Sequence, residues 1–203
     1  METITYERIP HIIERQYAAE QAFLAEFEAG NYTLTSPLVK LNPYEFCPLT
    51  AVVLFETPSV TEVTITVWGK EPAGNITHTF PAGKKHVLPI YGLYADYTNT
   101  VEIVLANGEK NLITIKTDTL MAGVPLATKM ETTKDYLGDN LIFLTAAMHS
   151  MPVAFDYKGD LRWYANVNFA FDVKRISNGH ILIGTERLIQ MPYFTTGIYE
   201  MAF

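Results

Sequence analysis

An internal repeat in residues 138–203 constrains the fold of this chain more than any other sequence feature. Ile142–Leu144 begins one apolar strand, and Ile181–Ile183 begins another at the corresponding place of the next copy. A spacing of about 40 residues, filled by short strands and Gly-containing turns, is typical of a β-propeller blade. Because a single blade cannot bury both faces of its sheet, blades stack around an axis. We therefore predict that residues 138–203 form the first one to two blades of an incomplete β-propeller, with the chain ending inside a blade.

Residues 34–118 have the pattern of an antiparallel β-sandwich. Leu49–Phe55 is a mostly apolar run, which suits a strand buried on both faces. The stretch from Val60 to Val67 alternates instead, and predicts a separate strand with one polar face. Asn107-Gly108, between two further apolar runs, predicts a hairpin, since Asn-Gly can adopt the positive φ pair of a type I′ turn. Short strands separated by Pro and Gly in this way indicate an immunoglobulin-like sandwich.

The N-terminal region, residues 1–33, is predicted to hold one amphipathic helix over residues 8–29. Gly30 and Asn31 are a good stop signal for it. Its polar face is acidic, unlike the basic face of a lipid-binding helix, so we expect its apolar stripe to pack on this protein or on a partner subunit. The apolar stripe consists of Ile9, Ile13, Tyr17, Phe23, Leu24 and Phe27.

Residues 119–137 have no clear periodicity and are predicted to be a linker.

The composition excludes several classes of function. A formal net charge of −7 argues against a nucleic-acid partner, which requires a basic face. No run of about 18 apolar residues is present, so no membrane insertion is expected. The first helix region is rich in glutamate and has no apolar signal-peptide core. We therefore expect either a protein that stays inside the cell or an export signal that is not part of this chain.

Metal and thiol chemistry are not indicated. The single cysteine, Cys47, permits no internal disulfide and no cysteine-rich metal site. Because Pro48 follows it directly, we expect Cys47 to be a small buried core residue rather than a nucleophile. His11, His78 and His86 lie far apart in sequence without ligand-like spacing, so no metal site is expected.

Asp156 and Asp160 could suggest a carboxylate pair for acid–base catalysis. They flank a Gly-containing turn, however, and Asp is favoured there because its side chain hydrogen-bonds the local backbone. We therefore expect both to have a structural role.

Six segments along the chain, taken in order, carry a family resemblance. They are Pro48–Val52, Val63–Lys70, Ile90–Tyr94, Asn99–Val101, Phe155–Tyr164 and Ile176–Gly179. Over residues 38–203 these segments resemble the bacterial aryl-sulfate sulfotransferase family. The resemblance implies that the sandwich is the N-terminal domain of that family and that the repeat is the start of its propeller.

The resemblance also implies a ping-pong reaction that needs no cofactor. A histidine in the central funnel of the propeller attacks the sulfur of an aryl sulfate donor, and the sulfohistidine then passes the sulfuryl group to a phenolic acceptor. The catalytic groups of the family lie in later blades, and no residue here matches the motif of the nucleophile. We therefore expect no catalytic residue in this chain and no activity of the chain by itself. Family members are often periplasmic or exported, and we expect the helix and an exposed sheet to help form a homodimer.

Two residues are candidates for the rim of the substrate channel. His149 falls in the turn between the second and third strands of a blade, and Arg187 lies at the corresponding place in the second copy, in an extended loop. Such turns often face the channel mouth of a propeller, where an arginine could attract an anionic sulfate. An ordinary solvated loop side chain is the alternative for both.

Two other functions stay open on the sequence alone. The chain could belong to a non-catalytic sandwich and propeller module for binding or dimerisation. It could also belong to another propeller enzyme, such as a lactonase or a quinoprotein-like dehydrogenase. Funnel histidines encoded after residue 203 would favour the sulfotransferase, whereas a metal or quinone requirement would favour the other enzymes.

Overall fold

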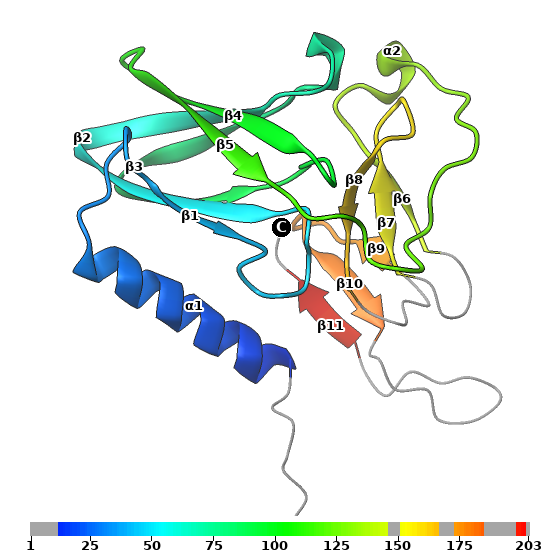
Figure 1. The fold of residues 1–203 in the computed structure, drawn as a ribbon, viewed down its shortest axis with the longest axis horizontal. Helices are drawn as coiled ribbons and strands as arrows, with labels where there is room; N and C mark the ends of the chain where they lie inside the picture. The colour runs from blue at the N-terminus through cyan, green and yellow to red at the C-terminus, as the bar shows by residue number, and fades with distance from the viewer. Residues whose placement is uncertain (1–11, 146–150, 167–172, 185–197, 202–203) are drawn as a thin grey trace, which may run out of the picture.

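The chain forms an N-terminal helix, a five-stranded antiparallel sheet and two three-stranded antiparallel sheets (Figure 1). The computed structural model describes residues 12–145, 151–166, 173–184 and 198–201. The fold is mainly β, as predicted. The helices are α1 (Ile12–Ala29), α2 (Lys134–Leu137) and a 3-10 turn, η1 (Pro72–Gly74). The strands are β1 (Leu38–Leu41), β2 (Ala51–Val67), β3 (Ile76–Ile90), β4 (Thr98–Leu105), β5 (Lys110–Lys116), β6 (Ile142–Leu144), β7 (Val153–Phe155), β8 (Leu161–Tyr164), β9 (Val173–Arg175), β10 (Ile181–Gly184) and β11 (Ile198–Met201).

Strand β2 organises the large sheet because it pairs with three other strands. β3 follows one edge of β2, while β1 pairs with Ala51–Leu54 and β4 with Val63–Val67 on the other edge. The ladder between β2 and β3 is interrupted between Glu56 and Thr61, and Pro58 in this interval has no backbone N–H to donate. The sheet curls, so that its two halves face each other across a shared core (Figure 1).

The structure joins two strands that the sequence predicted to be separate. The predicted strands covered residues 49–55 and 60–67, and β2 runs through both. Thr57–Ser59 has the composition of a turn, but β3 pairs with β2 on both sides of the interruption and carries the ladder across it. The prediction of two separate strands was therefore wrong. The interruption between Glu56 and Thr61 is a β-bulge within one strand.

Helix α1 covers the outer face of the first half of β2 (Figure 1). Phe23 and Phe27 are buried in a cluster with Leu38, Val52 and Leu54. The alternate residues of the same stretch of β2 face the core of the sandwich. Burial of this strand on both faces was predicted and is confirmed, and the helix supplies the second cover.

Only the C-terminal half of the predicted apolar stripe is buried. Phe23 and Phe27 are almost fully buried, whereas Ile13 is 58% exposed and Tyr17 is 64% exposed. Ile9 lies outside the described residues. The stripe therefore packs on its own chain through one half of the helix, and its other half remains at the surface.

The hairpin between β4 and β5 forms where it was predicted, but with a different turn. Gly108 has a φ of +87°, whereas Asn107 is not among the residues with positive φ. The Gly108 N–H donates to the carbonyl of Leu105, which makes a type I turn followed by a left-handed glycine rather than a type I′ turn. Gly159 and Gly179 also have positive φ, and in its own hairpin each donates its N–H to the carbonyl three residues earlier.

Both copies of the predicted repeat form strands, in two separate sheets. One sheet has the order β6-β7-β8 and the other the order β11-β10-β9. The structure pairs β9 with β10 across the turn at Ser177–Gly179. Each sheet has three strands within the described ranges, and a four-stranded blade and a closed ring stay predictions.

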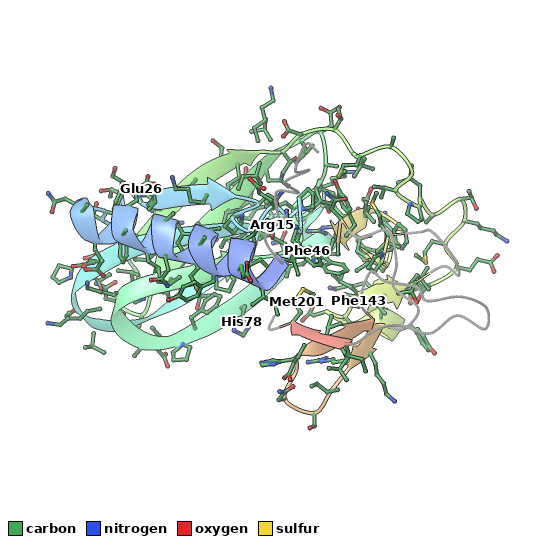
Figure 2. The ribbon with its side chains drawn as sticks, turned by 90° about the horizontal axis from the view of Figure 1, so that it is seen from below. Arg15, Glu26, Phe46, His78, Phe143 and Met201 are labelled. Carbon is green, nitrogen blue, oxygen red and sulfur yellow. The ribbon has the colours of Figure 1, made fainter. Side chains whose placement is uncertain are left out.

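The sheet of β6, β7 and β8 packs onto the sandwich. Residues of β7 and β8 on one face join the main core, and residues on the other face pack against Phe46, which lies where the sandwich meets the smaller sheets (Figure 2). The face toward the main core carries Val153, Phe155, Leu161 and Tyr164, and the opposite face carries Ala154 and Trp163.

The predicted linker, residues 119–137, also packs on the main core. Leu120, Val124 and Met130 are partly buried against it, and α2 is the only regular element of this segment. The segment therefore holds the two parts of the chain together rather than tethering them loosely.

Candidate functional site

The two residues predicted at the rim of a substrate channel lie outside the described residues. They are His149 and Arg187, and His11 lies outside as well. Their roles stay predictions. In residues 12–145, 151–166, 173–184 and 198–201, no group of three or more His, Cys, Asp or Glu side chains could hold a metal ion.

The described histidines have partners that account for them. The Nε2 atom of the buried His86 lies 3.0 Å from the Thr57 Oγ1 atom, whose hydroxyl donates to the Ser59 carbonyl at 2.9 Å. Burial lowers the pKa of His86, which favours a neutral ring. His180 lies at the surface, with its Nδ1 atom 2.7 Å from a carboxylate oxygen of Glu200.

Cys47 is a packing residue. It lies with Phe46 and Trp163 in the cluster that covers one face of the β6–β8 sheet. Burial raises the pKa of the Cys47 thiol to about 12, although a hydrogen bond with Trp163 acts in the opposite direction. The sequence predicted a buried core residue, whereas Cys47 is partly buried. Because the thiolate is the nucleophilic form, the raised pKa disfavours reaction of this thiol near neutral pH.

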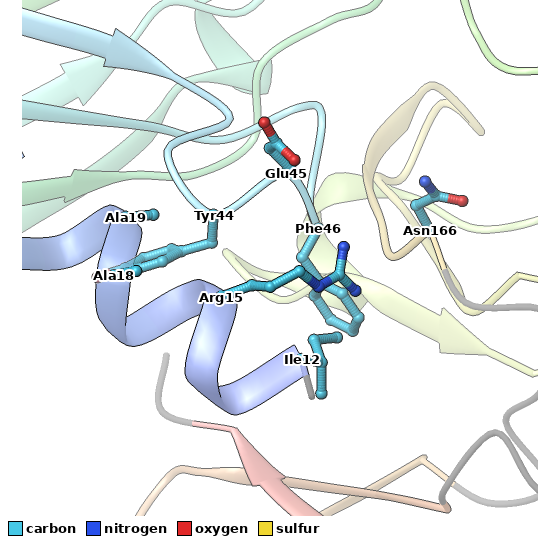
Figure 3. A pocket seen from close by; sticks show the side chains of 8 residues that line it. All are labelled: Ile12, Arg15, Ala18, Ala19, Tyr44, Glu45, Phe46 and Asn166. Atoms are coloured by element: carbon cyan, nitrogen blue, oxygen red, sulfur yellow. The ribbon is translucent and has the colours of Figure 1, made fainter. Parts of the chain in front are cut away.

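An open cavity of about 330 Å³ lies between α1 and the loop before β2 (Figure 3). The Tyr44 ring lies beside Ala18 of the helix, and its hydroxyl donates to Glu20 at 3.4 Å. Only Phe46 among the lining residues is buried, so no lining polar group is held in a fixed, desolvated position that would select a ligand. The lining residues are Ile12, Arg15, Ala18, Ala19, Tyr44, Glu45, Phe46 and Asn166.

Three of the segments that carry the family resemblance meet at a buried junction between the sandwich and the β6–β8 sheet. They are Val63–Lys70, Ile90–Tyr94 and Phe155–Tyr164. Arg162 lies at the centre, with its side chain fully buried. A charged side chain is almost never fully buried unless it is paired, so this position has a specific role.

A β-bulge places Arg162 in the junction. Ala154 pairs with Trp163 and Phe155 pairs with Leu161, so Arg162 is the extra residue on β8. Such a bulge breaks the alternation of the strand and re-aims one side chain. Leu161 consequently faces the main core with Phe155, Trp163 faces the opposite cluster with Ala154, and Arg162 points into the sandwich.

The guanidinium of Arg162 binds groups from both parts of the chain. Its Nε atom donates to the Gly92 carbonyl at 2.8 Å, and its Nη1 atom to the Gly74 carbonyl at 3.0 Å. The Nη1 atom also lies 2.9 Å from the Tyr94 hydroxyl and 3.0 Å from the Asp156 Oδ2 atom. The Cζ atom is 4.0 Å from the centroid of the Tyr94 ring. The Nη2 atom has no hydrogen-bond partner among the described residues.

Two glycines with little room for a side chain lie beside the guanidinium. A Cβ atom on Gly92, which has a φ of +82°, would lie 2.3 Å from the Ile76 Cδ1 atom. A Cβ atom on Gly74 would lie 3.3 Å from the Tyr94 hydroxyl and 3.9 Å from the Arg162 Nη1 atom. A side chain at Gly92 would therefore collide with Ile76 and strain the backbone, whereas one at Gly74 would press on Tyr94. We call the two glycines and Tyr94 the arginine slot.

Asn99 holds Tyr94 in the arginine slot. Asn99 is fully buried, accepts the Tyr94 N–H at 2.8 Å and donates to the Tyr94 carbonyl at 3.0 Å. It also donates to the Ile115 carbonyl at 3.3 Å, and so ties the loop after β3 to β5. Burial is the main cause that raises the pKa of Tyr94, which keeps its hydroxyl protonated at neutral pH.

Exposed ion pairs surround the buried arginine. The Lys70 Nζ atom lies 2.7 Å from the Asp160 Oδ1 atom, and the Lys158 Nζ atom lies 3.0 Å from Glu71. A hydrogen bond from Tyr157 is the main cause that lowers the pKa of Glu71. All of these contacts join the loop after β2 to the turn between β7 and β8, but exposed pairs of this kind add little stability.

Asp156 has the structural role that the sequence predicted and a second role that it did not. Its Oδ1 atom accepts the backbone N–H groups of Lys158 at 3.0 Å and Asp160 at 3.1 Å, which fixes the turn. Its Oδ2 atom balances the charge of Arg162. Because both charged groups are buried and bound to protein atoms, the junction is suited to holding two parts of the chain together and not to acid–base chemistry.

No helix in the described part of the chain combines the length and apolar character needed to cross a membrane.

Comparisons with known proteins identify the two parts that meet at this junction. A search of curated proteins gives no match. The family model of the arylsulfotransferase Ig-like domain matches residues 38–120, and that of the arylsulfotransferase (ASST) domain matches residues 126–203. The chain therefore belongs to the arylsulfotransferase family, with the Ig-like domain followed by residues of the ASST domain.

Proposed function

We propose that the complete protein transfers a sulfuryl group from an aryl sulfate to a phenol. A histidine nitrogen attacks the sulfur, the bond from sulfur to the aryl oxygen breaks, and the phenolate leaves. The oxygen of the acceptor phenol then attacks the same sulfur, the nitrogen–sulfur bond breaks, and the phenol proton is released. Each half-reaction balances without a cofactor.

The observation that supports this proposal is the serial match of two arylsulfotransferase family models, over residues 38–120 and 126–203. The match favours a sulfotransferase over a lactonase or a quinoprotein-like dehydrogenase. The β6–β8 and β9–β11 sheets are the start of the proposed propeller, and the substrate channel with His149 and Arg187 at its rim belongs to the same proposal. We place the catalytic histidines outside residues 1–203 and propose that this chain alone is inactive.

An assay of the complete protein with p-nitrophenyl sulfate tests the proposal. We expect release of p-nitrophenolate that depends on an added phenol and needs no adenylyl-sulfate cofactor. Without the acceptor, one histidine should retain a sulfuryl group that mass spectrometry detects. The 203-residue chain serves as the negative control, and we expect it to be inactive. Absence of transfer by the complete protein, or a stop codon directly after Phe203, would favour the non-catalytic binding module instead.

We also propose that the complete protein is a homodimer with the N-terminal half of α1 at its interface. Ile13 and Tyr17 expose large apolar surface on this helix, and a Tyr17→Glu substitution would place a charge there. We expect this variant to move from the dimer mass toward the monomer mass in light scattering. Tyr136→Glu, at a tyrosine that is 88% exposed on α2, should leave the mass unchanged. An unchanged mass for the Tyr17 variant would contradict this interface.

A further inference from the structure

We propose that Arg162 is an anchor that fixes the orientation of the first sheet of the ASST domain on the Ig-like domain. The inference does not depend on the sulfuryl chemistry. It starts from the position of Arg162, which comes from the β6–β8 sheet through a bulge and ends in the arginine slot of the sandwich.

The contacts of Arg162 divide between the two domains. Asp156 belongs to the same small sheet and supplies the counter-charge at 3.0 Å. The carbonyls of Gly74 and Gly92 and the hydroxyl of Tyr94 belong to the Ig-like domain and accept three hydrogen bonds of 2.8 to 3.0 Å from Arg162. One rigid group therefore spans the junction, and neither domain can move without breaking charge-assisted bonds.

The rest of the buried interface is largely apolar, although exposed ion pairs and a backbone hydrogen bond from the Asn166 N–H to the Phe46 carbonyl at 2.8 Å also cross it. Phe155, Leu161 and Tyr164 contribute apolar packing to the main core, and such packing is non-directional and tolerates small rotations. A guanidinium is planar and holds its donors in a fixed fork, so its bonds to three acceptors set an angle as well as a distance. We infer that apolar packing attaches the β6–β8 sheet to the Ig-like domain and that Arg162 sets the orientation of the sheet.

The exposed cation beside the same tyrosine cannot replace the anchor. The Lys70 Nζ atom lies 4.7 Å from the centroid of the Tyr94 ring and pairs with Asp160, but its side chain is 48% exposed. Water screens this pair, whereas Arg162 is fully buried. Lys70→Met is therefore the matched control for Arg162→Met, since both changes remove a cation next to Tyr94.

Hydrogen exchange of the complete protein gives the first test. We expect Arg162→Met to speed exchange by about 10- to 100-fold in peptides covering residues 153–164 and 88–94, as expected for losing charged hydrogen bonds. Exchange in β4 and β5 should stay as in the parent, and Lys70→Met should change none of these peptides. Parent-like exchange in Arg162→Met would overturn the proposal.

A second variant covers the case in which Arg162→Met does not fold because it leaves Asp156 buried without a counter-charge. Arg162→Met combined with Asp156→Asn removes both charges and keeps the Oδ1 acceptor of the turn. Spin labels on cysteines introduced at the exposed Glu109 and Leu144 would report the orientation of the two domains. We expect a narrow distance distribution in the parent and a broad one in the double variant. An equally narrow distribution in both would show that packing alone sets the orientation, and would overturn the proposal.

Discussion

Replacing Trp163 by alanine is expected to lower the free energy of opening of the β6–β8 sheet by about 3–5 kcal/mol. The indole is 1% exposed and packs with Phe46 and Ala154. The Phe143 ring also lies against it, with the two centroids 5.6 Å apart. Alanine would leave a cavity between the small sheet and the loop before β2, and that loop is fixed by the sandwich and cannot collapse into it.

Native-state hydrogen exchange of peptides covering residues 151–166 in the complete protein measures this loss. Trp68→Ala is the matched control, because this second tryptophan of the chain is 42% exposed and lies at the end of β2. Its removal should change the same free energy by no more than about 0.5 kcal/mol. Equal effects of the two substitutions would mean that Trp163 does not hold the small sheet in place.

Phe27→Ala is expected to cost a similar amount, about 3–5 kcal/mol, in the first half of β2. Phe27 is 4% exposed and packs with Val52 and Leu54, and its ring centroid lies 6.1 Å from that of Tyr32. Without this ring, the helix loses half of its buried aromatic contact with the sheet. The outer face of β2 then becomes accessible to water.

Exchange of the β1 and β2 amides, measured beside that of β5, detects the change. Tyr17→Ala is the control on the same helix, since Tyr17 is 64% exposed and outside the buried cluster. It should leave the β1 and β2 amides protected. If β1 and β2 keep the protection of the parent in Phe27→Ala, the helix is not the cover of this sheet.

The sequence predicted those features that depend on local pattern. The apolar run at residues 49–55 indicated a strand buried on both faces, and the structure confirms this for residues 51–55, with α1 on one side. Gly30 marked the end of the helix correctly. The position of the hairpin at Asn107 and Gly108 was also correct, because a glycine with positive φ is required in either type of turn.

Features that depend on distant partners were not predictable in the same way. The turn-like composition of Thr57–Ser59 suggested two strands, and only the pairing of β3 across the bulge shows that they are one. The helical periodicity of α1 gave no sign that Tyr17 is 64% exposed. Local sequence patterns indicate which structures a segment can adopt, and its contacts with neighbouring elements determine which of them forms.

Arg162 is the clearest example of a role that the sequence did not reveal. Within Phe155–Tyr164 it reads as an ordinary charge between apolar strand residues. Its burial depends on a bulge, on Asp156 in the preceding turn and on the glycines of the slot. A signal existed in the two aromatic residues directly after it, since a strand that reads Leu-Arg-Trp-Tyr has few positions left to face solvent. Asp156 was interpreted correctly as a turn residue, but its second oxygen was not considered.

The separation between Arg162 and its slot has a consequence for the order of events on the ribosome. Gly92 is synthesised 70 residues before the arginine that it binds. At about 5–20 residues per second, the ribosome needs several seconds to cover that distance. The nascent Ig-like domain therefore has time to form before Arg162 arrives and the later domain docks. Synthesis from the N-terminus therefore completes the arginine slot before the arginine that fills it.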